Sequence, residues 1–382
     1  MTVTATRSLT APDYRRVKRF VRLALPEGLE YRTADHIAVL PPNDRALVER
    51  AARLLDADLE TELLITSGRA NSDNLPIDRP VTVRELLTHH LELQGRLSLD
   101  QLRTLAVLNP CPPERQALQD LAANDTTEDM RTLFDLIEDY PALRTVLSWP
   151  MLLDLLPQRR LRQYSISSAP AVDPRHVDLM VSLLEAPALS GRGTFRGTGS
   201  GYLNSVRAGD LVLARVKPCR NAFRIRHDTP VIMVAAGTGL APFRGAIADR
   251  RVLAASGTAL PAAVCYFGCD SPDADFLHAD ELRSAERAGI VALRPAFSEA
   301  PADGHRFVQH RITAEADELW RLLNQGARIY VCGDGRHMAP GVRDAFRTIY
   351  AQRASAGHGP TPDEWLQELT IAGRYVEDVY AG

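Results

Sequence analysis

Residues 230–245 read PVIMVAAGTGLAPFRG, and this stretch decides the fold class of the second half of the chain. The apolar run 231–236 has the length of a buried strand, and it ends at Gly237, Thr238 and Gly239. Pro242 suits the first turn of a helix, and the glycines permit a close backbone approach to a phosphate. The stretch therefore predicts a strand, a tight turn and a helix, which is the repeating unit of a parallel α/β sheet.

The sequence after this stretch repeats the same pattern of an apolar run followed by a helix-like segment. Apolar runs alternate with helix-like segments, as expected for strands that are buried on both faces of a parallel sheet. The runs are AAVCYFG (262–268), IVALRPAFS (290–298) and ARIYVCG (327–333). We therefore expect one α/β domain over residues 229–382.

The sequence before residue 229 predicts strands on both sides of a helical block. Short runs bounded by turn residues are typical of strands. They are RFVRLAL (19–25) and DHIAVLPP (35–42), and later RQYSISSAP (162–170), HVDLMVSLLE (176–185), GTFRG (193–197) and DLVLARVK (210–217). We expect one antiparallel β domain formed by residues 1–43 and 159–228, interrupted by an insertion at 44–158.

The insertion repeats apolar residues at three- and four-residue spacing, which predicts helices. The first helix is expected to begin with Asn43 as its N-cap and with Asp44 at the positive end of its dipole. The helical segments are 46–55, 82–93, 99–108, 114–123, 130–140 and 149–156.

Composition restricts the class of protein. The 382 residues are 45% hydrophobic and 24% charged, which predicts a packed core. Net charge is −3, without the basic excess of a dedicated nucleic-acid binder. No apolar run is long enough to span a bilayer, and the first twenty residues lack the apolar centre of a signal peptide.

The five cysteines have neither the spacing of a zinc site nor the pattern of a disulfide scaffold. We therefore expect a reduced, cytoplasmic protein. No histidine cluster has metal-ligand spacing, so the sequence predicts no metal site and favours an organic cofactor.

Two segments of the β domain carry polar groups suited to a flavin nucleotide. In RQYSISS (162–168), Arg162 offers a planar fork to a pyrophosphate, Tyr164 a flat ring surface and Ser165 a hydroxyl. In GTGSGYL (197–203), a glycine-rich turn leads into a short helix whose start can hold phosphate. Taken alone, the first segment is equally consistent with a half-buried strand and the second with a surface loop.

Together these segments resemble the FAD-binding pair of the ferredoxin–NADP reductase superfamily. The resemblance is closer to its diflavin branch, which includes cytochrome P-450 reductase, sulfite reductase flavoprotein and the reductase half of self-sufficient bacterial fatty-acid hydroxylases. Similar motifs follow in order along nearly the whole chain: YRTADHIAVLPPN, NPCPPE, PVIMVAAGTGLAPFRG, YFGCDSPDADFLHADEL, AFSE, FVQH, IYVCGDGRHMA and GRYVEDVYAG. The resemblance implies an antiparallel FAD-binding barrel, a helical connecting insertion and a Rossmann-like nicotinamide domain.

The resemblance also assigns roles to residues. For the flavin it implies Arg162, Tyr164, Ser165, Met180, Val181, Ser182, Gly197, Thr198, Gly199, Ser200 and the stacking ring Tyr380, where relatives usually carry Trp. For hydride transfer it implies Ser165, Cys332 and Asp378, with Tyr380 moving aside for the nicotinamide. For NAD(P)H it implies Arg7, Gly237, Thr238, Gly239, Ser298, Glu299, Arg306 and Gln309.

One departure from the family's pattern concerns the adenosine 2′-phosphate. Relatives specific for NADPH hold this dianion with basic residues and a tyrosine, where this chain has Asp270, Glu299, His305 and Phe307. A carboxylate repels a phosphate but accepts hydrogen bonds from a free ribose diol. We therefore expect NADH to be preferred, whereas Arg306 nearby offers a compensating charge for NADPH.

Family members pass electrons from FAD to FMN in a flavodoxin-like domain. The sequence carries no flavodoxin-like segment and no haem-ligating cysteine signature. We expect the electron acceptor, an FMN domain or a haem monooxygenase, to be absent from this chain, which is either a stand-alone reductase or a fragment of a fusion. A flavin or quinone reductase acting on small acceptors is the alternative.

Overall fold

The computed structural model describes residues 1–66, 75–123, 131–191, 193–354 and 359–380. The chain divides into two compact units. Unit 1 comprises residues 1–39, 163–183 and 206–382, and unit 2 comprises residues 40–162 and 184–205. Among the described residues no helix is both long and apolar enough to cross a membrane.

A five-stranded parallel sheet forms the centre of the C-terminal part of unit 1. Its strands lie in the order β13-β12-β11-β14-β15, and every neighbouring pair is parallel. The predicted parallel sheet is thus confirmed. The strands are β11 (Val231–Ala236), β12 (Ala263–Cys269), β13 (Ala292–Phe297), β14 (Arg328–Asp334) and β15 (Tyr375–Tyr380).

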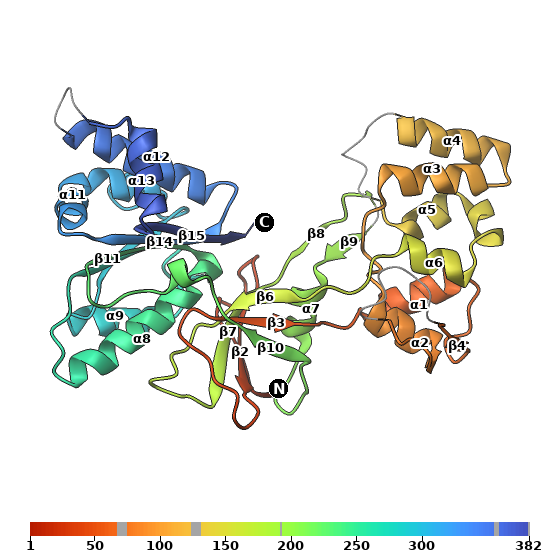
Figure 1. Ribbon diagram of the computed structural model, residues 1–382, viewed down its shortest axis with the longest axis horizontal. Helices are drawn as coiled ribbons and strands as arrows, with labels where there is room; N and C mark the ends of the chain where they lie inside the picture. Colours follow the sequence, from red (N-terminus) through yellow and green to blue (C-terminus); the bar gives the residue numbers. More distant parts are fainter. Residues whose placement is uncertain (67–74, 124–130, 192, 355–358, 381–382) are drawn as a thin grey trace. The chain divides into compact units, whose positions relative to one another are not determined.

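Helices cover both faces of this sheet, because alternate strand residues point to opposite sides. Val231, Met233 and Ala235 share one core with α8 and α9, whereas Ile232 and Val234 share another with α10 to α13. Figure 1 shows α8 and α9 on one side of the sheet and α11, α12 and α13 on the other. The bounds are η4 (Gly237–Leu240), α8 (Ala241–Ala255), α9 (Ala279–Arg287), α10 (Val308–Ala314), α11 (Ala316–Asn324), α12 (Met338–Arg353) and α13 (Pro362–Ile371).

Two three-stranded antiparallel sheets form the other part of unit 1. Their orders are β1-β2-β7 and β10-β3-β6, and strand β6 begins at the last residue of a unit 2 segment. Phe20, Val21 and Leu23 of β2 are buried, so this strand contributes to the core. The strands are β1 (Thr2–Ser8), β2 (Lys18–Ala24), β3 (His36–Val39), β6 (Arg162–Ser165), β7 (His176–Ser182) and β10 (Ala214–Lys217), followed by η3 (Asn221–Phe223).

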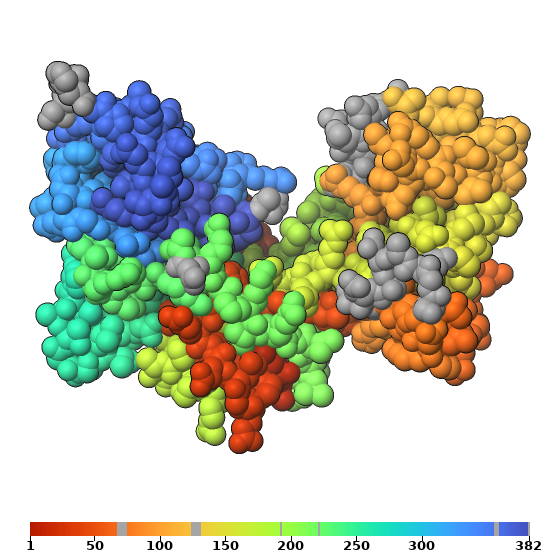
Figure 2. All heavy atoms as spheres, in the orientation of Figure 1, coloured from red at the N-terminus to blue at the C-terminus, as the bar shows by residue number. Residues whose placement is uncertain are grey.

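Unit 2 is mainly helical, as the spacing of apolar residues predicted. Its core is a cluster of leucines with a few other apolar side chains. In the space-filling view, the orange and yellow atoms of its described residues lie together in one body (Figure 2). The helices are α1 (Arg45–Leu54), α2 (Val83–Glu85), η1 (Leu86–His90), α3 (Leu99–Leu108), α4 (Pro112–Ala123), α5 (Leu133–Asp139), η2 (Pro141–Thr145), α6 (Trp149–Leu155) and α7 (Thr198–Ser205). Two hairpins, β4 (Glu62–Leu64) with β5 (Pro80–Thr82) and β8 (Glu185–Pro187) with β9 (Thr194–Arg196), complete the unit.

The N-cap of α1 differs from the expectation. Asp44 is the cap, and its side chain accepts a hydrogen bond from the Ala46 backbone N–H. Asn43 is buried instead, where its Nδ2 donates to the carbonyls of Leu87 and Leu91 at 2.6 and 2.7 Å. The prediction of Asn43 as N-cap was wrong because the asparagine satisfies backbone groups far away in the sequence.

Candidate active site

A cavity of about 330 Å³ lies at the carboxyl edge of the parallel sheet, within unit 1. Its lining includes residues that follow four different strands, because the carboxyl ends of parallel strands meet at one edge. Gly237 and Thr238 follow β11, Asp270 follows β12 and Ser298 follows β13, while Tyr380 ends β15. The structure therefore brings together most of the residues predicted to meet the nicotinamide nucleotide.

The turn after β11 requires glycine at two positions. Gly237 has φ +53°, a left-handed conformation that glycine adopts without strain. At Gly239, a Cβ atom would lie 2.2 Å from the Cys332 carbonyl oxygen. The turn thus lies directly against β14, and α8 begins behind it with Pro242 in its first turn, as predicted.

Cys332 and Ser165 meet although they are far apart in the sequence. Ser165 lies close enough to the Cys332 thiol to influence its pKa, and in the sheet register Cys332 of β14 pairs with Asp378 of β15. Cys332 is 2% exposed, and burial raises the pKa of its thiol well above the ordinary value of 9.0. At neutral pH the site therefore contains a protonated thiol, which donates or accepts a hydrogen bond but is not a nucleophile.

Tyr380 is the exposed one of the four predicted catalytic residues. Its side chain is 48% exposed, and its hydroxyl lies 3.5 Å from Thr238 Oγ1. The ring is therefore next to the glycine turn, where the resemblance predicted an aromatic residue that can move aside.

The structure adds one residue that the sequence analysis missed. His36, at the start of β3, places Nε2 2.9 Å from Asp378 Oδ2. The only sequence signal was its position within the motif YRTADHIAVLPPN. His36 therefore holds the carboxylate of Asp378, which is one of the three predicted catalytic residues, with Ser165 and Cys332.

Two of the residues that depart from the NADPH pattern, Asp270 and Phe307, line the cavity, whereas Glu299 is not among its described lining residues. Asp270 Oδ1 accepts a hydrogen bond from Ser298 Oγ at 2.7 Å, and Arg15 Nη2 contacts Glu299 at 2.6 Å and Asp270 at 3.3 Å. Arg16 lies 3.6 Å from Asp270. Arginines between β1 and β2 therefore already pair with both predicted carboxylates.

Asp270 is ionised at neutral pH. Burial opposes its charged form, but hydrogen bonds from Tyr14 and Ser298 together with the nearby Arg16 outweigh burial and lower its pKa below the ordinary value of 3.8. Arg306, Phe307 and Gln309 line the cavity, and the described lining does not include His305.

The predicted flavin residues of unit 1 lie on two strands. Tyr164 and Ser165 are on β6, while Met180, Val181 and Ser182 are on β7. Met180 and Val181 are buried, and Ser182 is exposed and lines the cavity.

The predicted pyrophosphate residues of unit 2 gather around one carboxylate that the sequence analysis missed. Arg162 Nη2 contacts Glu92 Oε2 at 2.7 Å, and Thr198 Oγ1 lies 3.4 Å from Glu92 Oε1. A Cβ atom on Gly197 would lie 2.9 Å from Ser200 Oγ, so this turn is as tight as predicted. Nearby, Arg159 is 2% exposed and its Nε and Nη2 have no hydrogen-bond partner among the described residues.

These residues fit the FAD pyrophosphate. They provide guanidinium donors with unused capacity, two hydroxyls and a tight glycine turn, which is the donor set that a pyrophosphate requires.

Arg7 packs against an aromatic ring of strand β2. Its guanidinium stacks on Phe20, 4.7 Å from the ring centroid, and burial followed by the charge of Arg244 lowers its pKa. Arg7 is not among the described residues that line the cavity. A contact between Arg7 and the nucleotide stays a prediction.

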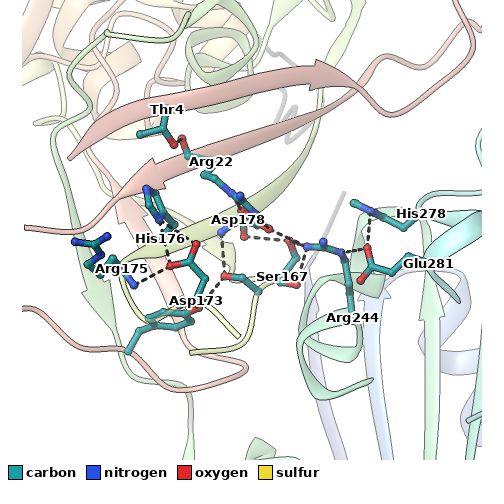
Figure 3. Close-up of polar contacts among 12 residues, drawn as sticks. Thr4, Arg22, Ser167, Asp173, Arg175, His176, Asp178, Arg244, His278 and Glu281 are labelled. Carbon is teal, nitrogen blue, oxygen red and sulfur yellow. Dashed lines mark hydrogen bonds and ion pairs between the residues drawn. The ribbon is translucent and has the colours of Figure 1, made fainter. Parts of the chain in front are cut away.

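A polar network in unit 1 connects strand β7 to helices α8 and α9. Arg244 of α8 contacts Asp178 at 3.1 Å and Glu281 at 3.0 Å, and it donates to the Ser167 carbonyl. Figure 3 shows Asp178 between Arg22 and Arg244, and Glu281 between Arg244 and His278. The network fixes α8, and with it the glycine turn, to the strand that carries Met180 and Ser182.

Comparison with known families agrees with this geometry. The family model described as FAD binding domain matches residues 1–202. The family model described as Oxidoreductase NAD-binding domain matches residues 233–344. The chain belongs to the FAD binding domain family.

Relatives extend the match over nearly the whole chain. A bifunctional cytochrome P450/NADPH--P450 reductase 2 of Bacillus subtilis is 38% identical over 384 residues, which cover 98% of this chain and 36% of that protein. A bifunctional cytochrome P450/NADPH--P450 reductase of Bacillus cereus is 33% identical over 383 residues, covering 98% and 36%. A self-sufficient cytochrome P450 monooxygenase of Phanerodontia chrysosporium is 36% identical over 388 residues, covering 99% and 36%. The chain thus spans about 36% of the length of these relatives.

Within this family the chain is an FAD-dependent NAD(P)H oxidoreductase unit, as the motifs predicted. When bound, FAD would supply an acceptor for hydride and a donor of single electrons. At the sheet edge this chain places Ser165 close to the Cys332 thiol, Asp378 in register with Cys332, and the Tyr380 hydroxyl 3.5 Å from Thr238 Oγ1. Such prearranged geometry is the main protein contribution to a hydride transfer.

Proposed function

We propose that this chain takes hydride from NAD(P)H onto FAD and passes the electrons to an acceptor outside the described chain. The observation that carries the proposal is the proximity of Ser165 to the Cys332 thiol, whose pKa it influences. This proximity brings the strand proposed to hold the flavin next to the sheet edge proposed to hold the nicotinamide. In our proposal, Ser165, Cys332 and Asp378 surround the point of transfer, and Tyr380 covers it until the nicotinamide enters.

The acceptor that we propose is a flavodoxin-like FMN domain, which in turn serves a haem monooxygenase. The names of the relatives support this choice, since they join a cytochrome P450 to an NADPH--P450 reductase in one protein. The chain matches only about 36% of their length, so the haem and FMN partners are proposed as separate segments or proteins.

We also propose that the two antiparallel sheets form an FAD-binding barrel. The proposed domains are residues 1–43 with 159–228 for FAD, 44–158 for the connecting insertion and 229–382 for NAD(P)H. The match of the FAD binding domain to residues 1–202, across the helical insertion, supports this division. We also propose that the protein is located in the cytoplasm.

For the nucleotide, we propose that NADH is preferred. Asp270 and Glu299 lie where a 2′-phosphate would require cations, and both carboxylates are already paired with Arg15. A 2′-phosphate would have to compete for these arginines, whereas a ribose diol donates hydrogen bonds to the carboxylates. The chain departs here from relatives named NADPH--P450 reductases.

Anaerobic reduction of the FAD-loaded protein by NADH and by NADPH tests the transfer. We expect the bound-flavin absorption to bleach with either nucleotide, with the larger kcat/KM for NADH. Electron delivery to a haem acceptor should depend on added flavodoxin. A colourless protein that gains no flavin absorption with FAD contradicts the proposal, and rapid reduction of free quinones without saturation by flavodoxin favours the alternative flavin or quinone reductase.

Charge reversal tests the nucleotide preference. We expect Glu299→Arg to raise kcat/KM for NADPH by about tenfold and to lower it for NADH, because the arginine attracts the 2′-phosphate but cannot accept a hydrogen bond from the ribose diol. Glu185→Arg, a reversal on a unit 2 hairpin, is the control. A wild-type preference for NADPH, unaltered by Glu299→Arg, contradicts NADH preference without affecting the proposed hydride transfer.

A further inference from the structure

A buried ammonium lines the nucleotide cavity. The chain has two lysines, Lys18 and Lys217, among 45 basic residues. Lys217 is exposed on β10, whereas Lys18, the first residue of β2, is 6% exposed and lines the cavity. Lysine is rarely buried without an anionic partner, so the position of Lys18 calls for a physical reason.

Part of the reason is Asp275. Lys18 Nζ lies 2.6 Å from Asp275 Oδ2, and Asp275 is 1% exposed. Asp275 Oδ1 also accepts the backbone N–H groups of Asp270 and Ser271 at 2.7 and 2.9 Å. The carboxylate is therefore fixed by the loop after β12, and it holds the ammonium in one place.

The ammonium is next to the glycine turn. A Cβ atom built on Gly237 would lie 3.8 Å from Lys18 Nζ and 3.9 Å from its Cε. On the other side, Nζ lies 5.8 Å from the centre of the Tyr14 ring. Lys18 thus places a fixed positive charge beside the turn that precedes α8.

The ammonium has hydrogen-bonding capacity to spare. It carries three N–H donors, and within the described part of the chain Asp275 is its one hydrogen-bond acceptor. Two donors remain for an anion in the cavity. The pyrophosphate of a dinucleotide is such an anion, and backbone N–H groups at a glycine turn are its usual partners.

We propose that Lys18 is a ligand of the pyrophosphate common to NADH and NADPH, with Asp275 as the residue that positions its ammonium. This inference rests on the proposed function, since it assigns a contact within that nucleotide site. It supplies affinity that does not depend on the 2′-phosphate, in a cavity that Asp270 also lines.

Calorimetric binding of NAD⁺, NADP⁺ and ADP to the full FAD-loaded chain tests the proposal. We expect Lys18→Met to weaken all three by a similar factor of about 10 to 100, because a charge-assisted hydrogen bond to each pyrophosphate is lost. Lys18→Arg should restore part of the affinity. Lys217→Met, a substitution of the exposed lysine, is the matched control and should bind all three ligands like the wild type.

The double variant Lys18→Met/Asp275→Asn separates a ligand from a structural ion pair. It removes the Asp275 charge that Lys18→Met alone leaves buried without a cation. We therefore expect the double variant to fold with a Tm near that of the wild type and to bind ADP more weakly than the wild type does. A folded double variant that binds ADP like the wild type overturns the proposal. Wild-type protein that binds ADP through Lys18 but does not reduce FAD contradicts the proposed function and leaves the Lys18 contact standing.

Discussion

Cys332 is placed where a small side chain can influence hydride transfer without reacting itself. Its thiol is buried and close to Ser165, and the residue is in register with Asp378. Because burial raises its pKa well above 9.0, the thiol stays protonated across the neutral range. Its contribution is therefore that of a neutral thiol beside Ser165 rather than that of a charge.

Substitution of Cys332 should separate these roles. We expect Cys332→Ala to slow flavin reduction by about tenfold, because Ser165 loses its partner at the point of transfer. Cys332→Ser keeps a hydrogen-bonding group and should lose less. Anaerobic stopped-flow absorbance from pH 6 to 9 measures both rates. A steep rise of the wild-type rate that Cys332→Ser abolishes would instead identify a reactive thiolate.

The sequence identified single residues better than it identified their partners. Ser165, Cys332, Asp378 and Tyr380 were predicted through motifs, and the structure brings them to one edge of the sheet. The partners His36, Glu92 and Asp275 were missed, because each is distant in the sequence from the residue that it contacts. Asn43 shows the same limit, since its buried hydrogen bonds to residues 87 and 91 cannot be inferred from local helix rules.

At the scale of elements, apolar runs predicted strands well where both faces are buried. β11, β12 and β14 were found for this reason, and the turn after β11 was found through its glycines. β15 was not predicted as a strand, because the segment YVEDVY contains two carboxylates and its last two residues are exposed at the sheet edge. β1 was not predicted as a strand, because most of its residues are polar and only one of them is fully buried.

The glycine turn gives a prediction at this scale. Gly239→Ala would place a Cβ atom 2.2 Å from the Cys332 carbonyl oxygen and 2.6 Å from its carbonyl carbon. Because backbone on both sides must shift, we expect a loss of about 3 kcal/mol in the free energy of unfolding, together with weaker NAD⁺ binding. Urea unfolding and calorimetry measure the two effects.

Gly257→Ala is the matched control for this turn. Gly257 has φ +84° but nothing within 4 Å of a Cβ atom, so only conformational strain of about 1 kcal/mol is expected, with NAD⁺ affinity unchanged. If the two alanine variants behave alike, close approach to β14 is not what requires glycine at position 239.

At the scale of the whole of unit 1, one network joins segments that the sequence keeps far apart. Arg22 of β2, Asp178 of β7, Arg244 of α8 and Glu281 of α9 form a continuous chain of ion pairs (Figure 3). Asp178 is 2% exposed in its side chain, so the arginines on either side compensate a buried charge. The network ties the proposed flavin strand to the helix that follows the nucleotide turn.

Glu281 makes the acid stability of this network testable. Burial opposes its ionisation, but the hydrogen bond with His278 and the charge of Arg244 prevail and lower its pKa from 4.5 to about 2. The unfolded chain therefore binds more protons in this interval, so the stabilisation is complete above about pH 4.5 and is lost as the pH falls towards 2. Glu281→Gln should lower Tm at pH 7 and flatten the dependence of Tm on pH below 4.5.

Thermal unfolding of both proteins from pH 7 downwards measures this difference. Glu49→Gln is the control, because Glu49 also pairs with an arginine, at 2.7 Å, but on an exposed helix surface where an ion pair contributes little. Its Tm should follow the wild type at every pH. A Glu281→Gln variant that keeps the full acid slope would mean that carboxylates outside this network control the acid stability, and that Arg244 is held to β7 by Asp178 without help from α9.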